Sequence, residues 1–215
     1  MTPLPSRLLV VTDRHLASRD LPAIVEEAVS AGARWIWFRD KDLARRARLA
    51  LARQVHEAIA GRATLTIGAD IDLARELGVK AVHLSMSADL SSARRQLGDD
   101  AFLGLSAHSL SAVAQAKIEG ADYVTLSPIF LTSSKPGYGP ALGLSCLNAA
   151  AALDVPVLAL GGVCPMNVQS ILDARAAGVA VMGKIMQAHG IRAKVATYLS
   201  SLEEVPRTAR AGLTD

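Results

Sequence analysis

The sequence predicts a single (β/α)8 barrel. Eight short apolar runs alternate with stretches of helical periodicity, and polar or small residues follow each run at once. This alternation is typical of parallel strands joined by helices. A length of 215 residues fits one such barrel and leaves no room for a second domain. We therefore expect residues 1–203 to form the barrel and residues 204–215 to form a flexible C-terminal tail.

The predicted strands are the apolar runs themselves. They are Leu8–Val11, Ala33–Phe38, Thr64–Ile67, Ala81–Leu84, Phe102–Leu105, Tyr123–Leu126, Val157–Leu160 and Val179–Met182. Barrels of this kind carry their chemistry at the C-terminal ends of the strands. The few residues that follow each run are therefore the candidate functional residues.

The predicted helices lie between these runs and begin at residues suited to capping. Asp20, Asp70 and Ser109 each precede a periodic stretch and are expected N-caps. The helical stretches are 21–31, 43–59, 71–77, 90–97, 110–119, 144–153, 166–176 and 191–202. Together with the strands they account for nearly all of residues 8–202.

Composition and charge exclude several functional classes. The net charge is only +3, and the arginines at 45, 46 and 48 are expected to form a solvated helix face rather than a nucleic-acid surface. Neither a signal pattern nor an apolar run of membrane-spanning length is present, which predicts a cytoplasmic protein without membrane contact. Cys146 and Cys164 have no metal-ligand spacing and are expected to be unpaired thiols. A homo-oligomer remains open.

Two glycine turns follow the last two strands. Gly161 and Gly162 come after the seventh run, and Gly183 with Lys184 comes after the eighth. Glycine lets backbone N–H groups approach an anion closely, and the helix that follows adds its positive end. Barrels often hold a phosphate at these two loops. The pair therefore predicts a phosphate site.

Two further groups of residues could bind anions. The loop after the sixth run, residues 127–143, is long and rich in hydroxyls, and its Thr132, Ser134 and Lys135 could grip a phosphate or pyrophosphate. Arg39 and Lys41 follow the second run two positions apart, so that both side chains point the same way on an extended segment. A surface ion pair of these residues with Asp40 or Asp42 is the alternative.

An ordered set of short motifs resembles the thiamine phosphate synthase/TenI family. The resemblance runs from about Leu8 to Met186 and is carried by the whole series, because no single piece is decisive. The pieces are Leu9–Arg14, Phe38–Lys41, Ala81–Leu84, Leu105–Ser109, Gly120–Val124, Pro128–Phe130 with Thr132 and Lys135, Leu160–Val163 and Ala177–Met182.

The resemblance implies two activities. In this family the synthase joins hydroxymethylpyrimidine pyrophosphate to a thiazole phosphate and releases pyrophosphate. TenI proteins bind the same kind of thiazole phosphate, and some catalyse its aromatising tautomerisation. By resemblance, the pyrophosphate side is Arg39, Lys41 and Ser106, and the phosphate-gripping loop is Thr132, Ser134 and Lys135. The thiazole phosphate cradle is Gly162, Met182 and Gly183.

The chain departs from the synthase pattern at its metal site. The family usually has glutamine where this chain has Trp37, and Asn-Asp-Asp where it has Gly68, Ala69 and Asp70. The second usual Mg²⁺ carboxylate is replaced by Ala88. Loss of two ligands removes charge that a departing pyrophosphate needs. No cofactor is therefore expected, and Mg²⁺ would be required only if the chain is a synthase, with Asp70 or Asp89 as ligands of a shifted site.

The tautomerase interpretation needs a general base. TenI proteins with this activity have a histidine after the sixth strand, where this chain has Pro128. His83 lies in an apolar run and is expected to be a satisfied core residue. His108 follows Ser106 at the end of the fifth strand and is the best candidate base, with a surface position at a helix start as the alternative.

Three functional hypotheses remain from the sequence. The first is a TenI-like enzyme that moves a proton on a thiazole phosphate, and the second is a thiamine phosphate synthase with a metal-poor site. The third is a non-catalytic protein that binds thiazole or thiamine phosphates and acts by regulation. Turnover of hydroxymethylpyrimidine pyrophosphate with Mg²⁺ separates the second from the others, and tautomer conversion separates the first from the third.

Overall fold

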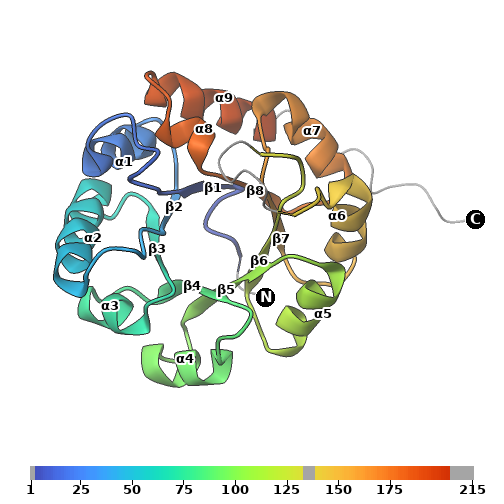
Figure 1. Ribbon diagram of the computed structural model, residues 1–215, viewed down its shortest axis with the longest axis horizontal. Helices are drawn as coiled ribbons and strands as arrows, with labels where there is room; N and C mark the ends of the chain where they lie inside the picture. The colour runs from blue at the N-terminus through green and yellow to red at the C-terminus, as the bar shows by residue number, and fades with distance from the viewer. Residues whose placement is uncertain (1–2, 133–138, 204–215) are drawn as a thin grey trace, which may run out of the picture.

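The chain folds into a closed barrel of eight parallel strands surrounded by helices, as predicted (Figure 1). The structure is a computed structural model and describes residues 3–132 and 139–203. Each strand pairs with the next along the chain, and β8 pairs with β1 to close the ring. The strands are β1 (Leu8–Val11), β2 (Trp35–Phe38), β3 (Thr64–Gly68), β4 (Ala81–Ser85), β5 (Phe102–Ala107), β6 (Tyr123–Leu126), β7 (Val157–Leu160) and β8 (Gly178–Val181).

The helices form the outer layer and follow the predicted order with small shifts at their ends. They are α1 (Leu21–Ser30), α2 (Arg45–Ile59), α3 (Ile71–Glu76), α4 (Leu90–Leu97), α5 (Leu110–Ile118), α6 (Gly143–Ala151), α7 (Pro165–Asp173), α8 (Gly183–Met186) and α9 (Ile191–Glu203). The sequence did not predict α8, because a helix of one turn is too short to show a period. None of the described helices is long and apolar enough to span a bilayer.

Two apolar layers arise because side chains alternate along each strand. In β1, Leu8 and Val10 pack outward against the helices, whereas Leu9 and Val11 fill the barrel interior. Large aromatic side chains share that interior, and Leu4 packs against the same cluster from the segment before β1. Side chains therefore fill the lower interior, and a cavity lies toward the C-terminal ends of the strands.

Capping side chains fix where three helices begin beside the barrel mouth. Asp70, Asp89 and Ser109 accept hydrogen bonds from backbone N–H groups of α3, α4 and α5. A cap of this kind is worth about 1 kcal/mol. Asp20 is the N-cap residue of α1, as predicted, but its side chain forms no capping hydrogen bond.

Arg48 corrects the expectation of a solvated arginine face on α2. Its side chain is buried, with its guanidinium 2.8 Å from Asp70 and hydrogen-bonded to the carbonyl of Gly68. The residue therefore ties α2 to the end of β3, while Arg45 and Arg46 are exposed as expected. Both cysteines are unpaired, as expected. The tail at residues 204–215 lies outside the described residues.

Candidate active site

A cavity of about 510 Å³ opens at the C-terminal end of the barrel, and residues from all eight strand ends line it. Every predicted catalytic or phosphate-binding residue that the structure describes is part of this lining: Arg39, Lys41, Ser106, His108, Thr132, Gly161, Gly162, Met182 and Gly183. Ser134 and Lys135 lie outside the described residues. The cavity is large enough for a drug-sized ligand.

The cavity wall carries positively charged side chains, and two of them have no carboxylate partner among the described residues. Arg39, Lys41 and Lys184 line it, and no aspartate or glutamate appears among the described lining residues. Lys41 and Lys184 form no ion pair or hydrogen bond with any part of the chain that the structure describes. Three cations in one cavity favour an anionic ligand. Lys184 was not among the predicted site residues, although its position directly after Gly183 places it at the end of the eighth strand.

The turn after β7 is held open by glycine. Gly161 and Gly162 have φ angles of +91° and +67°, which glycine adopts readily. A Cβ at Gly162 would lie 2.6 Å from the carbonyl oxygen of Leu131, so any side chain there would collide with the loop after β6. The two loops are therefore packed backbone to backbone at one side of the cavity.

Backbone N–H groups at this turn are available for a ligand. The N–H groups of Gly162 and Gly183 donate to no backbone carbonyl among residues 3–132 and 139–203. Asn167 secures the turn, since its side chain accepts from the Cys164 N–H at 2.9 Å and donates to the Gly162 carbonyl at 3.0 Å. α7 begins directly after this turn and directs its positive end toward the cavity side of the fold.

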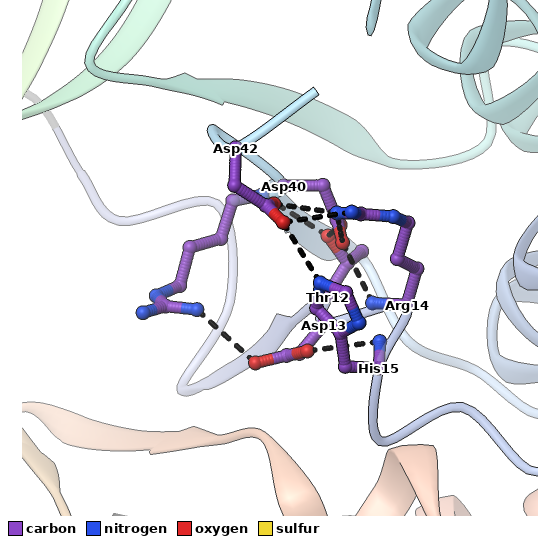
Figure 2. Close-up of polar contacts among 7 residues, drawn as sticks. Thr12, Asp13, Arg14, His15, Asp40 and Asp42 are labelled. Carbon is purple, nitrogen blue, oxygen red and sulfur yellow. Dashed lines mark hydrogen bonds and ion pairs between the residues drawn. The ribbon is translucent and has the colours of Figure 1, made fainter. Parts of the chain in front are cut away.

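The loops after β1 and β2 form a hydrogen-bonded cluster around Asp40 and Asp42 (Figure 2). Asp13 of this cluster forms an ion pair with Arg39. Asp40 is almost completely buried and accepts from the Thr12 hydroxyl and the Arg14 N–H, each at 2.6 Å. Thr12 in turn accepts from the Arg39 N–H at 3.0 Å, and Asp13 pairs with the Arg39 guanidinium at 3.2 Å. The alternative interpretation expected a surface ion pair with Asp40 or Asp42. Arg39 pairs with Asp13 instead, and it also belongs to the cavity lining.

Asp42 completes this cluster on its exposed side. Its carboxylate receives both terminal nitrogens of Arg14 and lies 2.8 Å from His15 Nε2. Hydrogen bonds from Arg14 and then His15 lower the pKa of Asp42 well below its usual range. The cluster leaves Lys41, which lies between the two aspartates, directed to the cavity lining.

His108 lines the cavity, and a hydrogen bond fixes the protonation of one of its ring nitrogens. Its Nδ1 lies 2.9 Å from the carbonyl oxygen of Ser127, an acceptor, so Nδ1 carries a hydrogen. In the neutral ring Nε2 then holds the lone pair, which is the form that a general base requires. The side chain is exposed and directly precedes Ser109, the N-cap of α5, so both sequence interpretations of this histidine describe it in part.

His83 also lines the cavity, although its place in an apolar run predicted only a core residue. It is 2% exposed and both ring nitrogens are hydrogen-bonded, as expected for a satisfied core histidine. Burial lowers its pKa to about 3, so the ring is neutral. The missed signal is strand alternation: Val82 and Leu84 face the helices, which turns His83 inward.

Trp37 and Gly68 pack directly against each other at the cavity wall. A Cβ at Gly68 would lie 2.7 Å from the indole nitrogen of Trp37, so a side chain larger than glycine would collide with this ring. The indole packs on His83 with ring centroids 3.9 Å apart. The β2–β3 side of the cavity is therefore aromatic in this chain, and the buried indole nitrogen of Trp37 has no hydrogen-bond partner within residues 3–132 and 139–203.

The donor atoms of the cavity do not fit Mg²⁺, which the synthase resemblance implies. Mg²⁺ is bound through carboxylates, and the described lining has none. Asp70 and Asp89 are engaged as N-caps and lie outside that lining. Residues 133–138 contain no acidic residue either. Within the described ranges no three His, Cys, Asp or Glu side chains come together as a metal site.

Comparisons with known proteins identify the family of this chain. A family model described as "Thiamine monophosphate synthase" matches residues 8–185. The chain belongs to the thiamine monophosphate synthase/TenI family. A putative thiamine-phosphate synthase of Geobacter sulfurreducens is 37% identical over 206 residues, which cover 94% of this chain and 95% of that protein. A thiamine-phosphate synthase of Roseiflexus castenholzii is 37% identical over 195 residues, or 86% and 85% of the two chains.

A solved structure shares the barrel. Thiamine phosphate pyrophosphorylase from Pyrococcus furiosus superposes with a TM-score of 0.81 at 25% identity, covering 92% of this chain and 95% of that one. The predicted family and fold are thus confirmed. As a member of the thiamine monophosphate synthase/TenI family, the chain is a thiamine-biosynthesis protein, and the roles of its individual site residues remain predictions.

Proposed function

We propose that this protein binds a thiazole phosphate in the cavity and moves a proton on the bound ring, as TenI tautomerases do. The cavity's charge carries the proposal. Three cationic side chains and the glycine turns after β7 and β8 surround a space whose described lining contains no carboxylate. Such a site favours a phosphorylated ligand and lacks the carboxylates for a metal-assisted departure of pyrophosphate.

His108 is the proposed general base. Its Nδ1 hydrogen is held by the Ser127 carbonyl, so Nε2 can remove a proton from a carbon of the bound ring. The ligand then takes a proton back at another carbon, which leaves its composition unchanged and its ring aromatic. The cavity cations bind the phosphate and orient the ring for this transfer. The buried His83 is neutral and contributes no charge to this proton transfer.

Thiamine phosphate synthase activity is the second candidate. The names of relatives that are 37% identical favour it, and so does the pair Arg39 and Lys41 at the cavity wall. These two cations, with Lys184, would have to stabilise the leaving pyrophosphate. We expect this activity to be weak, because the carboxylates that usually hold Mg²⁺ are Ala69 and Ala88 here.

One purified preparation tests both candidates. The non-aromatic thiazole phosphate carboxylate is incubated with the protein, and conversion to the aromatic tautomer is followed by proton NMR. In parallel, hydroxymethylpyrimidine pyrophosphate, thiazole phosphate and Mg²⁺ are supplied, and pyrophosphate release is measured. We expect conversion in the first assay and little release in the second. Robust Mg²⁺-dependent release would contradict the proposal, and binding without conversion would favour a regulatory role.

A further inference from the structure

A series of buried polar side chains crosses the barrel interior and ends at the cavity. The indole N–H of Trp35 donates to Thr66 Oγ1 at 2.8 Å. Burial raises the pKa of Tyr123, and the neighbouring Thr66 side chain lowers it in part. Tyr123 Oη lies 2.9 Å from His83 Nδ1, and His83 Nε2 lies 2.9 Å from Ser106 Oγ. His83 and Ser106 line the cavity. The series therefore joins the core to a residue that can touch a ligand.

The direction of these hydrogen bonds is set at the Trp35 end. An indole nitrogen can only donate, so Thr66 accepts from Trp35 and its own hydrogen is available for Tyr123. Tyr123 can then donate to His83 Nδ1. If Tyr123 donated to Thr66 instead, the Thr66 hydroxyl would accept two hydrogen bonds, and its own buried hydrogen would have no acceptor among the described residues. Buried polar groups are rarely left unpaired, so the first order is favoured.

The other end of the series leads to the same direction. Two hydroxyls face His83 Nε2, those of Ser106 at 2.9 Å and Thr125 at 3.3 Å. An N–H can be shared between two acceptors, whereas one ring lone pair accepts a single hydrogen well. Because burial keeps the ring neutral, only one nitrogen carries a hydrogen. Both ends of the series thus place that hydrogen on Nε2.

We propose that Tyr123 and His83 are positioning residues that hold the Ser106 hydroxyl as a hydrogen-bond donor to an anion in the cavity. Ser106 accepts from His83, so its own hydrogen points away from the ring and toward the ligand. With the opposite tautomer Ser106 would present lone pairs to the phosphate and repel it. The inference rests on the phosphate binding of the proposed function, while the tautomer itself is independent of any ligand.

Nitrogen NMR of the labelled protein tests the tautomer directly. Comparison with the His83→Gln variant assigns the His83 signals among the five histidines. We expect Nε2 to have the shift of a protonated nitrogen and Nδ1 that of an unprotonated one at neutral pH. The opposite assignment would overturn the inference, whether or not the protein binds phosphate.

Two variants that each delete one buried hydroxyl test the path. Tyr123→Phe removes the donor to Nδ1, and we expect affinity for inorganic phosphate to fall about three- to tenfold, the effect of one misdirected hydrogen bond to an anion. Thr66→Val is the matched control, because Tyr123 then has His83 as its acceptor and the tautomer should persist. Equal affinity of Tyr123→Phe and wild type would contradict the proposal.

Replacement of His83 separates positioning from packing. The amide of His83→Gln can still donate to Ser106, so this variant should bind inorganic phosphate more tightly than His83→Leu, which cannot donate. Equal affinities of the two would overturn the role of the His83 hydrogen. A wild type that has the Nε2–H tautomer but binds no phosphate would instead overturn the proposed function and the anion-binding role of Ser106.

Discussion

Gly162→Ala should destabilise the fold and also damage the phosphate site, and the structure allows the loss of stability to be divided into two parts. The first part is backbone strain, since alanine at a φ of +67° costs about 1–2 kcal/mol. The second is collision, since the new Cβ would lie 2.6 Å from the Leu131 carbonyl oxygen and 2.6 Å from Phe130 Cβ. Overpacking of this kind costs about 1–3 kcal/mol. The sum is about 2–5 kcal/mol.

Gly78→Ala is the matched control for the strain alone. Gly78 also has a φ of +67°, but a Cβ there meets nothing within 4 Å. It lies between α3 and β4, outside the cavity lining. We expect the control to lose only the first 1–2 kcal/mol or so of unfolding free energy, and to bind inorganic phosphate as the wild type does.

The assay is calorimetric titration with inorganic phosphate, together with urea unfolding of each variant. In Gly162→Ala the loop at Phe130 and Leu131 must move away from the turn after β7, so the N–H groups no longer converge on one anion. We expect affinity to fall at least tenfold, which corresponds to about 1.4 kcal/mol. Wild-type affinity in a folded Gly162→Ala protein would refute the assignment of the phosphate to this turn.

Three other predictions concern the base, the missing carboxylate and the buried histidine. His108→Gln should slow tautomerisation by about 10²–10⁴-fold while ligand affinity stays nearly unchanged, and full activity in single-turnover measurements would place the base elsewhere. Ala69→Asp adds a carboxylate to the cavity wall, so it should weaken phosphate binding without Mg²⁺ and regain part of it with Mg²⁺; titrations with and without the metal would detect this difference. The fold lowers the pKa of His83 to about 3, so as pH falls below about 6.5 the unfolded chain binds a proton that the folded chain does not. The unfolding free energy should therefore decline toward pH 3, by at most about 1.4 kcal/mol per pH unit from this group. Urea unfolding of His83→Gln should lack that part of the pH dependence.

The order of elements and the location of the site could be predicted from the sequence. Strand runs and helical periods are local, and parallel strands joined by helices bring every strand end to one face. For this reason Arg39, His108 and the glycine pair at 161 and 162 were placed at the barrel mouth, where the structure has them. Capping by Asp70 was predicted for the same reason, since a cap contacts its own helix.

Contacts between distant strands were decided only by the closed barrel. His83 pairs with Tyr123, 40 positions along the chain, because β5 places Gly104 between β4 and β6 and leaves room for the phenol ring. Arg48 is buried and not solvated as expected, because its guanidinium contacts Asp70 and the carbonyl at the end of β3. The chemistry of a buried side chain depends on its neighbours in space, and ring closure, which no local pattern records, selects those neighbours.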